Sequence, residues 1–130
     1  MKSELFYLAA AAVLTAVLWI PYVLDRFVVR GIPDTVGYPD NPRPASPWAA
    51  RLKLAHANAV ENLVVFATLV LVASALGITG ASIATAALLY FWARVVHVLA
   101  YTFRVPWLRT LGFLGGFAAQ VWVAALIFSR

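Results

Sequence analysis

The chain of 130 residues contains no cysteine and few charged residues. Without cysteine it can form no disulfide, no thiolate metal site and no cysteine nucleophile. Charged residues make up 12% of the sequence and hydrophobic residues 64%, whereas a soluble domain is roughly one quarter charged and one half apolar. One small core could not bury so much apolar surface, so the composition predicts an integral membrane protein.

The net charge of +5 does not indicate a nucleic-acid partner in this chain. The basic residues cluster in loops and at the ends of apolar segments, where membrane orientation and lipid headgroups explain them. We therefore expect membrane lipids, and no nucleic acid, as partners.

Four apolar segments predict an all-α, integral membrane four-helix bundle of four transmembrane helices, forming a single domain over residues 1–130. The first apolar run, residues 5–24, is about as long as a bilayer core of about 30 Å requires. It has no basic leader and no clear cleavage site, so we interpret it as a retained span. The predicted helices cover residues 4–25, 47–76, 81–103 and 106–129, approximately, and Pro21 is expected to kink the first.

A polar loop is predicted over residues 31–46, because its prolines fix φ and lack a hydrogen-bond donor. It can be a plain connector or a lid over a site at the membrane face. Ser46 and Pro47 have the residue types of a helix N-cap and first helical position.

Orientation follows from the lysines and arginines. The side that receives the first and third loops has seven of the ten, and the other side has Lys2 and Arg130. The positive-inside rule therefore puts both termini outside and loops 1 and 3 in the cytoplasm. Short loops and the lack of a targeting peptide favour a bacterial inner membrane. The seven residues are Arg26, Arg30, Arg43, Arg51, Lys53, Arg104 and Arg109.

Polar residues follow one side of each of two neighbouring helices. At about 100° per residue, Arg51, Asn58 and Glu61 share a side of the second helix. Arg94, His97 and Tyr101 form a stripe on the third. The turn at residues 77–80 makes these helices antiparallel, and Glu61 and Arg94 lie at similar distances from it along the chain.

We therefore predict that Glu61 and Arg94 pair, within a subunit or across an interface. Such a buried pair can also serve only to fix helix register. No metal site is predicted, since the second histidine, His56, stands on another helix. Gly112 and Gly116 have the G-x-x-x-G spacing that permits close helix approach.

Three motifs carry a family resemblance: AHANAVENLVVF at residues 55–66, ARVVHVLAY at 93–101 and PWLRT at 106–110. In order and spacing they resemble the MAPEG family, the membrane-associated proteins of eicosanoid and glutathione metabolism, with a bacterial-type member expected here. The resemblance runs from about residue 51 to residue 130. It implies a homotrimer that binds glutathione between subunits and conjugates it to, or reduces, lipophilic substrates.

The resemblance also implies roles for individual residues. Asn58 and Glu61 would contact the glutathione backbone, Arg94 would support Glu61, and Tyr101 would help to hold the peptide. Arg109 would be the catalytic cation, because a positive charge near a thiol favours the thiolate. The implied cofactor-binding set is Arg51, Asn58, Glu61, Arg94, His97 and Tyr101.

The chain departs from the family pattern at two positions. Family enzymes typically have an arginine four residues before the asparagine, where this chain has Leu54, and some have one at the position of Ala57. Arg51 and Lys53 lie nearby and can substitute. These departures keep open a second interpretation, a non-catalytic lipid-binding or scaffold protein of the same fold. A small transporter is the third, since polar residues on facing helices can line a path.

Overall fold

The computed structural model describes residues 1–130, and all its regular elements are helices. They are α1 (Ser3–Val17), α2 (Trp19–Val36), α3 (Pro47–Ala75), α4 (Ala81–Thr102) and α5 (Pro106–Phe128). By length and composition the chain has four candidate membrane spans, α1 and α2 together counting as one. The predicted all-α membrane bundle with four transmembrane segments is confirmed.

The first span differs from the single helix predicted over residues 4–25. It breaks at Leu18, between α1 and α2. Pro21 explains the break, because it has no N–H to donate to the carbonyl of Val17, the last residue of α1.

The predicted loop over residues 31–46 was wrong at its beginning. Gly31 interrupts α2 with a φ of +78°, yet the chain resumes helical turns up to Val36. Pro33 stands at the start of these turns, where its missing N–H has little cost. The hydroxyl of Thr35 donates to the carbonyl of Gly31 at 2.8 Å and to that of Arg26 at 3.0 Å, so this short segment is stabilised against the end of the main helix.

The start of α3 is fixed by a contact from α2. Ser46 occupies the predicted N-cap position and Pro47 the first helical position, although the Ser46 side chain makes no cap hydrogen bond. The backbone N–H of Ser46 instead donates to Oδ2 of buried Asp25 at 2.9 Å. This hydrogen bond joins the two ends of the polar connection.

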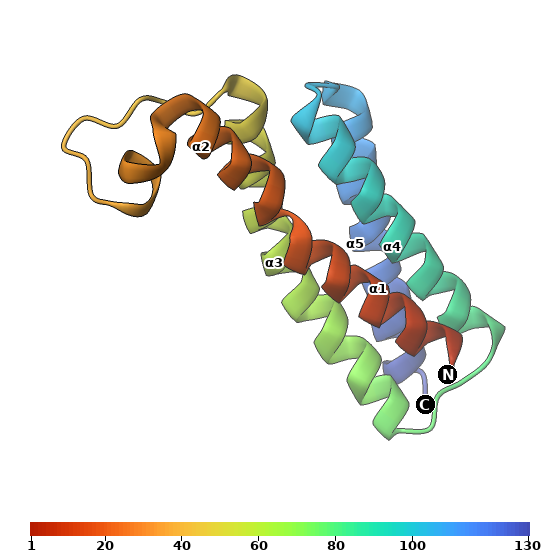
Figure 1. Cartoon of the computed structure of the whole chain (residues 1–130). Coiled ribbons are helices and arrows are strands. Elements are labelled where there is room, and N and C mark those ends of the chain that lie inside the picture. Colours follow the sequence, from red (N-terminus) through yellow and green to blue (C-terminus); the bar gives the residue numbers. More distant parts are fainter.

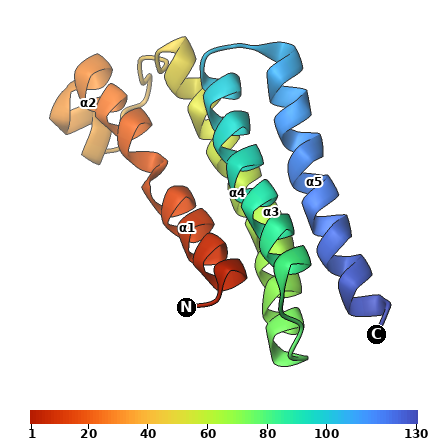
Figure 2. The same cartoon turned by 90° about the vertical axis from the view of Figure 1, so that its right-hand side faces the viewer.

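Figures 1 and 2 show both termini and the 77–80 turn at one end of the bundle, and the polar connection and the α4–α5 link at the other. We call the second end the basic end, because seven of the ten lysines and arginines lie on segments there. Helix α4 is central and contacts α1, α3 and α5. Only 27 of 130 residues are buried, so most of the apolar surface must face lipid or another copy of the chain.

Close packing of α4 and α5 depends on a glycine. A Cβ at Gly112 would lie 2.9 Å from the backbone nitrogen of His97 and 3.0 Å from the carbonyl oxygen of Ala93. At Gly116 the nearest atom would be Cδ of Arg94, a flexible side chain, at 3.4 Å. Of the three glycines of α5, Gly112 is therefore the one at which a side chain would meet the backbone of α4, one turn after Arg109.

We expect Gly112→Ala to force α5 away from α4, at a cost of about 1–3 kcal/mol, typical of overpacking. The measurement is resistance to unfolding by sodium dodecyl sulfate in mixed micelles. Gly116→Ala is the matched control and should unfold close to the wild type. Equal effects of the two substitutions would contradict the role given to Gly112.

Candidate functional site

A chain of polar contacts crosses the middle of the bundle. Oδ1 of Asn58, on α3, accepts a hydrogen bond from Nη2 of Arg94, on α4, at 2.6 Å. The same oxygen accepts from Nδ2 of Asn62 at 3.2 Å. On α5, Nε2 of Gln120 donates to the backbone oxygen of Asn62 at 3.2 Å and to its Oδ1 at 3.4 Å. Three helices are thus joined through side chains that could not be left unpaired in an apolar interior.

Arg94 is the buried cation of this network, with 3% of its surface exposed. Its Nε and Nη1 atoms are buried without hydrogen-bond partners, and its acceptors are an amide oxygen and an imidazole nitrogen rather than a carboxylate. A guanidinium in this state is costly to bury. This excess of buried donors is a feature of ligand sites more than of an ordinary core.

The predicted Glu61–Arg94 pair does not form within one chain, and pairing across an interface stays a prediction. Glu61 is exposed on the surface of the protomer, and Asn58 takes its place against Arg94. Counting from the turn placed Glu61 at a suitable depth, but it did not fix the direction around the helix. Residues three apart differ by about 60° around the axis, which here turns Glu61 out of the bundle.

His97 connects Arg94 to a cleft at the basic end. Nη2 of Arg94 lies 3.3 Å from Nδ1 of His97. Since a guanidinium has only donors, Nδ1 must accept, and the ring proton then stands on Nε2. His97 thus accepts a hydrogen bond from the buried Arg94 through Nδ1 and has its own N–H donor at Nε2. The same residue lines the cleft.

The cleft has a volume of about 310 Å³ and lies between the end of α4 and the start of α5. The guanidinium carbon of Arg109 lies 5.0 Å from the centroid of the Tyr101 ring, a cation–π contact. The rings of His97 and Tyr101 meet edge to face at 5.6 Å. The lining residues are His97, Tyr101, Arg109, Thr110 and Phe113.

The structure therefore brings most of the candidate site residues together. Asn58, Arg94, His97, Tyr101 and Arg109 form one continuous series from the middle of the bundle to the basic end.

Two candidates lie apart from this series. Arg51 contacts Thr102, the residue after Tyr101. Its Nε donates to the backbone oxygen of Thr102 at 2.9 Å. Glu61 does not join the series within the protomer.

Four residues of the arrangement were absent from the candidate set. Thr110 belongs to the PWLRT motif, and Phe113 lies one turn after Arg109, so helical spacing could have indicated both. Asn62 and Gln120 are polar residues within apolar segments, and that pattern could have indicated a shared contact.

A family model identifies the family to which the chain belongs. The MAPEG family model matches residues 6–129. The chain belongs to the MAPEG family. No curated protein and no solved structure matches it. This MAPEG protein is thus an integral, multi-pass membrane protein of the family associated with eicosanoid and glutathione metabolism. The match covers all five helices except the first three residues of α1.

The Asn58–Arg94 hydrogen bond gives a stability prediction. Asn58→Leu should lower the free energy of unfolding by about 2–3 kcal/mol, because it removes an acceptor from a buried charge. Arg94→Met should cost less, since no charge then remains in the core. In the Asn58→Leu/Arg94→Met double variant most of the loss should be recovered.

A double-mutant cycle in mixed micelles measures this coupling. Additive losses in the double variant would show that the two side chains do not depend on each other.

Proposed function

We propose that this MAPEG protein is a glutathione-dependent membrane enzyme that conjugates glutathione to lipophilic substrates or reduces them. The observation that carries the proposal is the arrangement of His97, Tyr101 and Arg109 around one cleft at the basic end. Membership in the family adds the expectation that glutathione is the ligand.

The residues present fit the chemistry of glutathione, which has two carboxylates, one amino group and one thiol. The cleft offers the Arg109 guanidinium, the Tyr101 hydroxyl and the Nε2 proton of His97, and its lining contains no acidic residue. The unpartnered donors of Arg94 lie behind His97. A donor-rich, cationic site of this kind favours an anionic ligand.

Each residue then has a role that follows from its position. When bound, glutathione supplies a thiol as nucleophile or reductant. Arg109 provides the positive charge that favours the thiolate form, and its contact with Tyr101 holds the guanidinium at the cleft. Arg94 and Asn58 act at a distance as positioning residues, since Arg94 orients His97 and Asn58 orients Arg94.

Glu61 supports a site shared between subunits. It is exposed, and the other exposed residues nearest to it on α3, Ala57, Val60, Val64 and Val65, are apolar. A carboxylate facing lipid is costly. A second copy packed on this face of α3 removes the cost, and Glu61 is then available to the amino group of glutathione. We therefore propose the homotrimer implied by the family resemblance as the functional unit.

The proposed orientation follows from the basic end. Seven lysines and arginines on its segments favour the cytoplasmic face, so the cleft opens toward cytoplasmic glutathione, in a bacterial inner membrane with both termini outside.

A second candidate function, a non-catalytic lipid-binding or scaffold protein, is favoured by one observation. Leu54 and Ala57 occupy positions where family enzymes have arginine, and both are exposed on α3. With fewer cations beside Asn58, the face of α3 that contacts a second copy of the chain would bind the carboxylates of glutathione less strongly.

Glutathione binding to the purified protein, measured by calorimetry in detergent, tests the proposal. We expect saturable binding that weakens about ten- to one hundred-fold in Arg109→Gln, the loss typical of a hydrogen bond to a charged group. Arg43→Gln is the matched control, because Arg43 is an exposed residue of the connection between α2 and α3, which Figure 1 shows at the basic end. It should bind like the wild type.

The outcomes separate the two candidate functions. Wild-type binding together with turnover of model electrophiles or lipid hydroperoxides supports the enzyme. Binding without turnover supports the scaffold, and no binding at millimolar glutathione excludes both a substrate and a cofactor role for this thiol.

The shared site gives a further expectation. The mass of the protein in detergent, corrected for bound detergent, should be three times the chain mass of 14.1 kDa. Glu61→Gln should weaken glutathione binding while the assembly stays trimeric, since an amide can occupy the same space without pairing with an amine. A wild-type protein that is monomeric in detergent, and whose glutathione binding equals that of Glu61→Gln, would contradict the shared site.

A further inference from the structure

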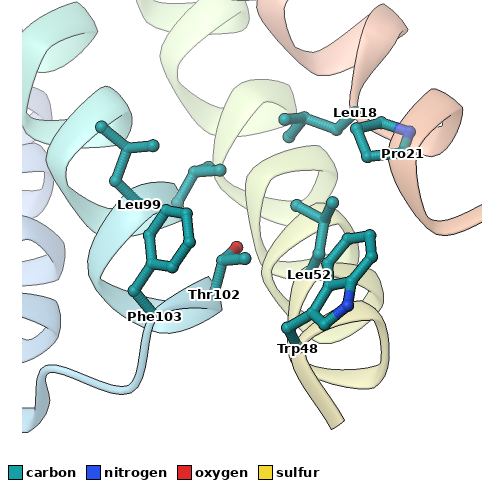
Figure 3. Close-up of a pocket in the computed structure, with 8 residues that line it drawn as sticks. Leu18, Pro21, Trp48, Leu52, Leu99, Thr102 and Phe103 are labelled. Carbon is teal, nitrogen blue, oxygen red and sulfur yellow. The ribbon is translucent and has the colours of Figure 1, made fainter. Parts of the chain in front are cut away.

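A second, separate hollow opens at the basic end of the bundle. It is a groove of about 500 Å³ between the α1–α2 junction, the start of α3 and the end of α4. Figure 3 shows Leu52 and Trp48 on one side and Leu99 and Phe103 on the other. The groove shares no lining residue with the cleft around Arg109. Its lining is Leu18, Pro21, Trp48, Leu52, Val98, Leu99, Thr102 and Phe103.

Two cations lie directly beside this groove in the chain. Arg51 precedes Leu52, and its Nε is fixed on the carbonyl oxygen of Thr102 at 2.9 Å, which keeps the guanidinium next to the groove residues of both helices. Arg104 follows Phe103 and is exposed. The Arg51 contact therefore fixes one positive charge beside the apolar groove, and Arg104 follows a groove residue in the chain.

Arg104 occupies a backbone conformation that favours glycine. Arg104 has a φ of +63°, the left-handed conformation in which glycine usually ends a helix. The N–H of Val105 donates to the carbonyl oxygen of Ala100 at 2.8 Å, which closes the end of α4 around this residue. Glycine would fit this conformation better, but it would carry no charge.

The groove also contains one unsatisfied polar group. Thr102 is 7% exposed, and its hydroxyl oxygen is buried without a hydrogen-bond partner. Thr102 is the last residue of α4, and its backbone oxygen accepts from Arg51. Phospholipids have ester carbonyls between the phosphate and the acyl chains. A small movement of the side chain would let this hydroxyl donate to such a carbonyl.

We propose that this groove binds an anionic phospholipid, with one acyl chain along Leu18, Val98 and Leu99 and the phosphate at Arg51 and Arg104. Each feature matches one part of the lipid: the apolar groove matches an acyl chain, the Thr102 hydroxyl an ester carbonyl, and the cationic rim, Arg51 and Arg104, the phosphate. The groove shares no lining residue with the cleft proposed for glutathione. Arg51, which the family resemblance puts in the cofactor-binding set, donates to Thr102 beside the groove and does not line that cleft.

A groove at the opposite end provides the contrast. It is equally large, about 510 Å³, and its lining, which includes Val13, Leu14 and Phe91, is wholly apolar. Met1, which carries the N-terminal ammonium, also lines it, and Lys2 follows Met1 in the chain. This groove has no counterpart of the buried Thr102 hydroxyl or of the Arg51 guanidinium that a hydrogen bond fixes beside the first groove. We therefore expect headgroup preference to depend on the first groove, where a guanidinium is fixed by a hydrogen bond, more than on the second.

Native mass spectrometry of the detergent-purified protein, with phosphatidylglycerol and phosphatidylcholine supplied in equal amounts, tests the proposal. The wild type should retain phosphatidylglycerol preferentially. Leu99→Trp should abolish retention by filling the groove, and this side chain is 53% exposed, so the core is undisturbed. Val13→Trp, 63% exposed in the wild type, is its matched control and should behave like the wild type.

Loss of charge at the rim gives a second, graded test. Arg104→Gln should reduce the preference for phosphatidylglycerol about five-fold, the effect of one basic residue near an anionic lipid, and Lys2→Gln should leave it unchanged. Arg104→Gly should reduce the preference similarly while melting at the same or a higher temperature, because glycine suits the backbone conformation. This result would separate lipid binding from folding.

Three results would overturn the proposal. The first is equal retention of the two lipids by the wild type. The second is an equal effect of Leu99→Trp and Val13→Trp. The third is a change of oligomeric state in Leu99→Trp with unchanged lipid retention, which would assign the groove to a neighbouring copy of the chain.

Discussion

The hydrogen bond between Arg94 and Asn58 is the constraint on which the arrangement of this bundle depends. A guanidinium that is almost completely buried must keep its acceptors, and those acceptors come from α3 and from the same helix, at 2.6 Å and 3.3 Å. This requirement fixes the rotation of α3 against α4. It also defines the state of His97, because an imidazole that accepts from arginine must carry its proton on the other nitrogen.

The same core cation relates stability to the site. Arg94 lies between the polar contacts of Asn62 and Gln120 on one side and the His97–Tyr101–Arg109 series on the other. The close approach of α5 at Gly112 brings the start of that helix, and with it Arg109, to the end of α4. A cleft built in this way is preorganised by helix packing rather than by loops, so its geometry persists without a ligand.

Much of the architecture was readable from the sequence, and the exceptions have physical causes. Apolar segment lengths and the Ser46-Pro47 pair located the helices, because hydrophobicity and backbone constraints are local properties. The contact between Arg109 and Tyr101 and the exposure of Glu61 were not readable, because each depends on helix rotation and approach. The helical turns after Gly31 are held by the Thr35 hydroxyl, whose single proton is shared between the carbonyl oxygens of Gly31 and Arg26, and composition does not reveal this contact.

The hydrogen bond between Ser46 and Asp25 has a consequence for how chains with this bundle can vary. This hydrogen bond fixes the start of α3 against α2. The position of α3 therefore does not depend on the exposed residues near Tyr38. Doubling the length of such a closed segment costs only about 0.6 kcal/mol in chain entropy. The connection can therefore lengthen or shorten during evolution, or accept an inserted label, while the first turn of α3 stays where Asp25 holds it.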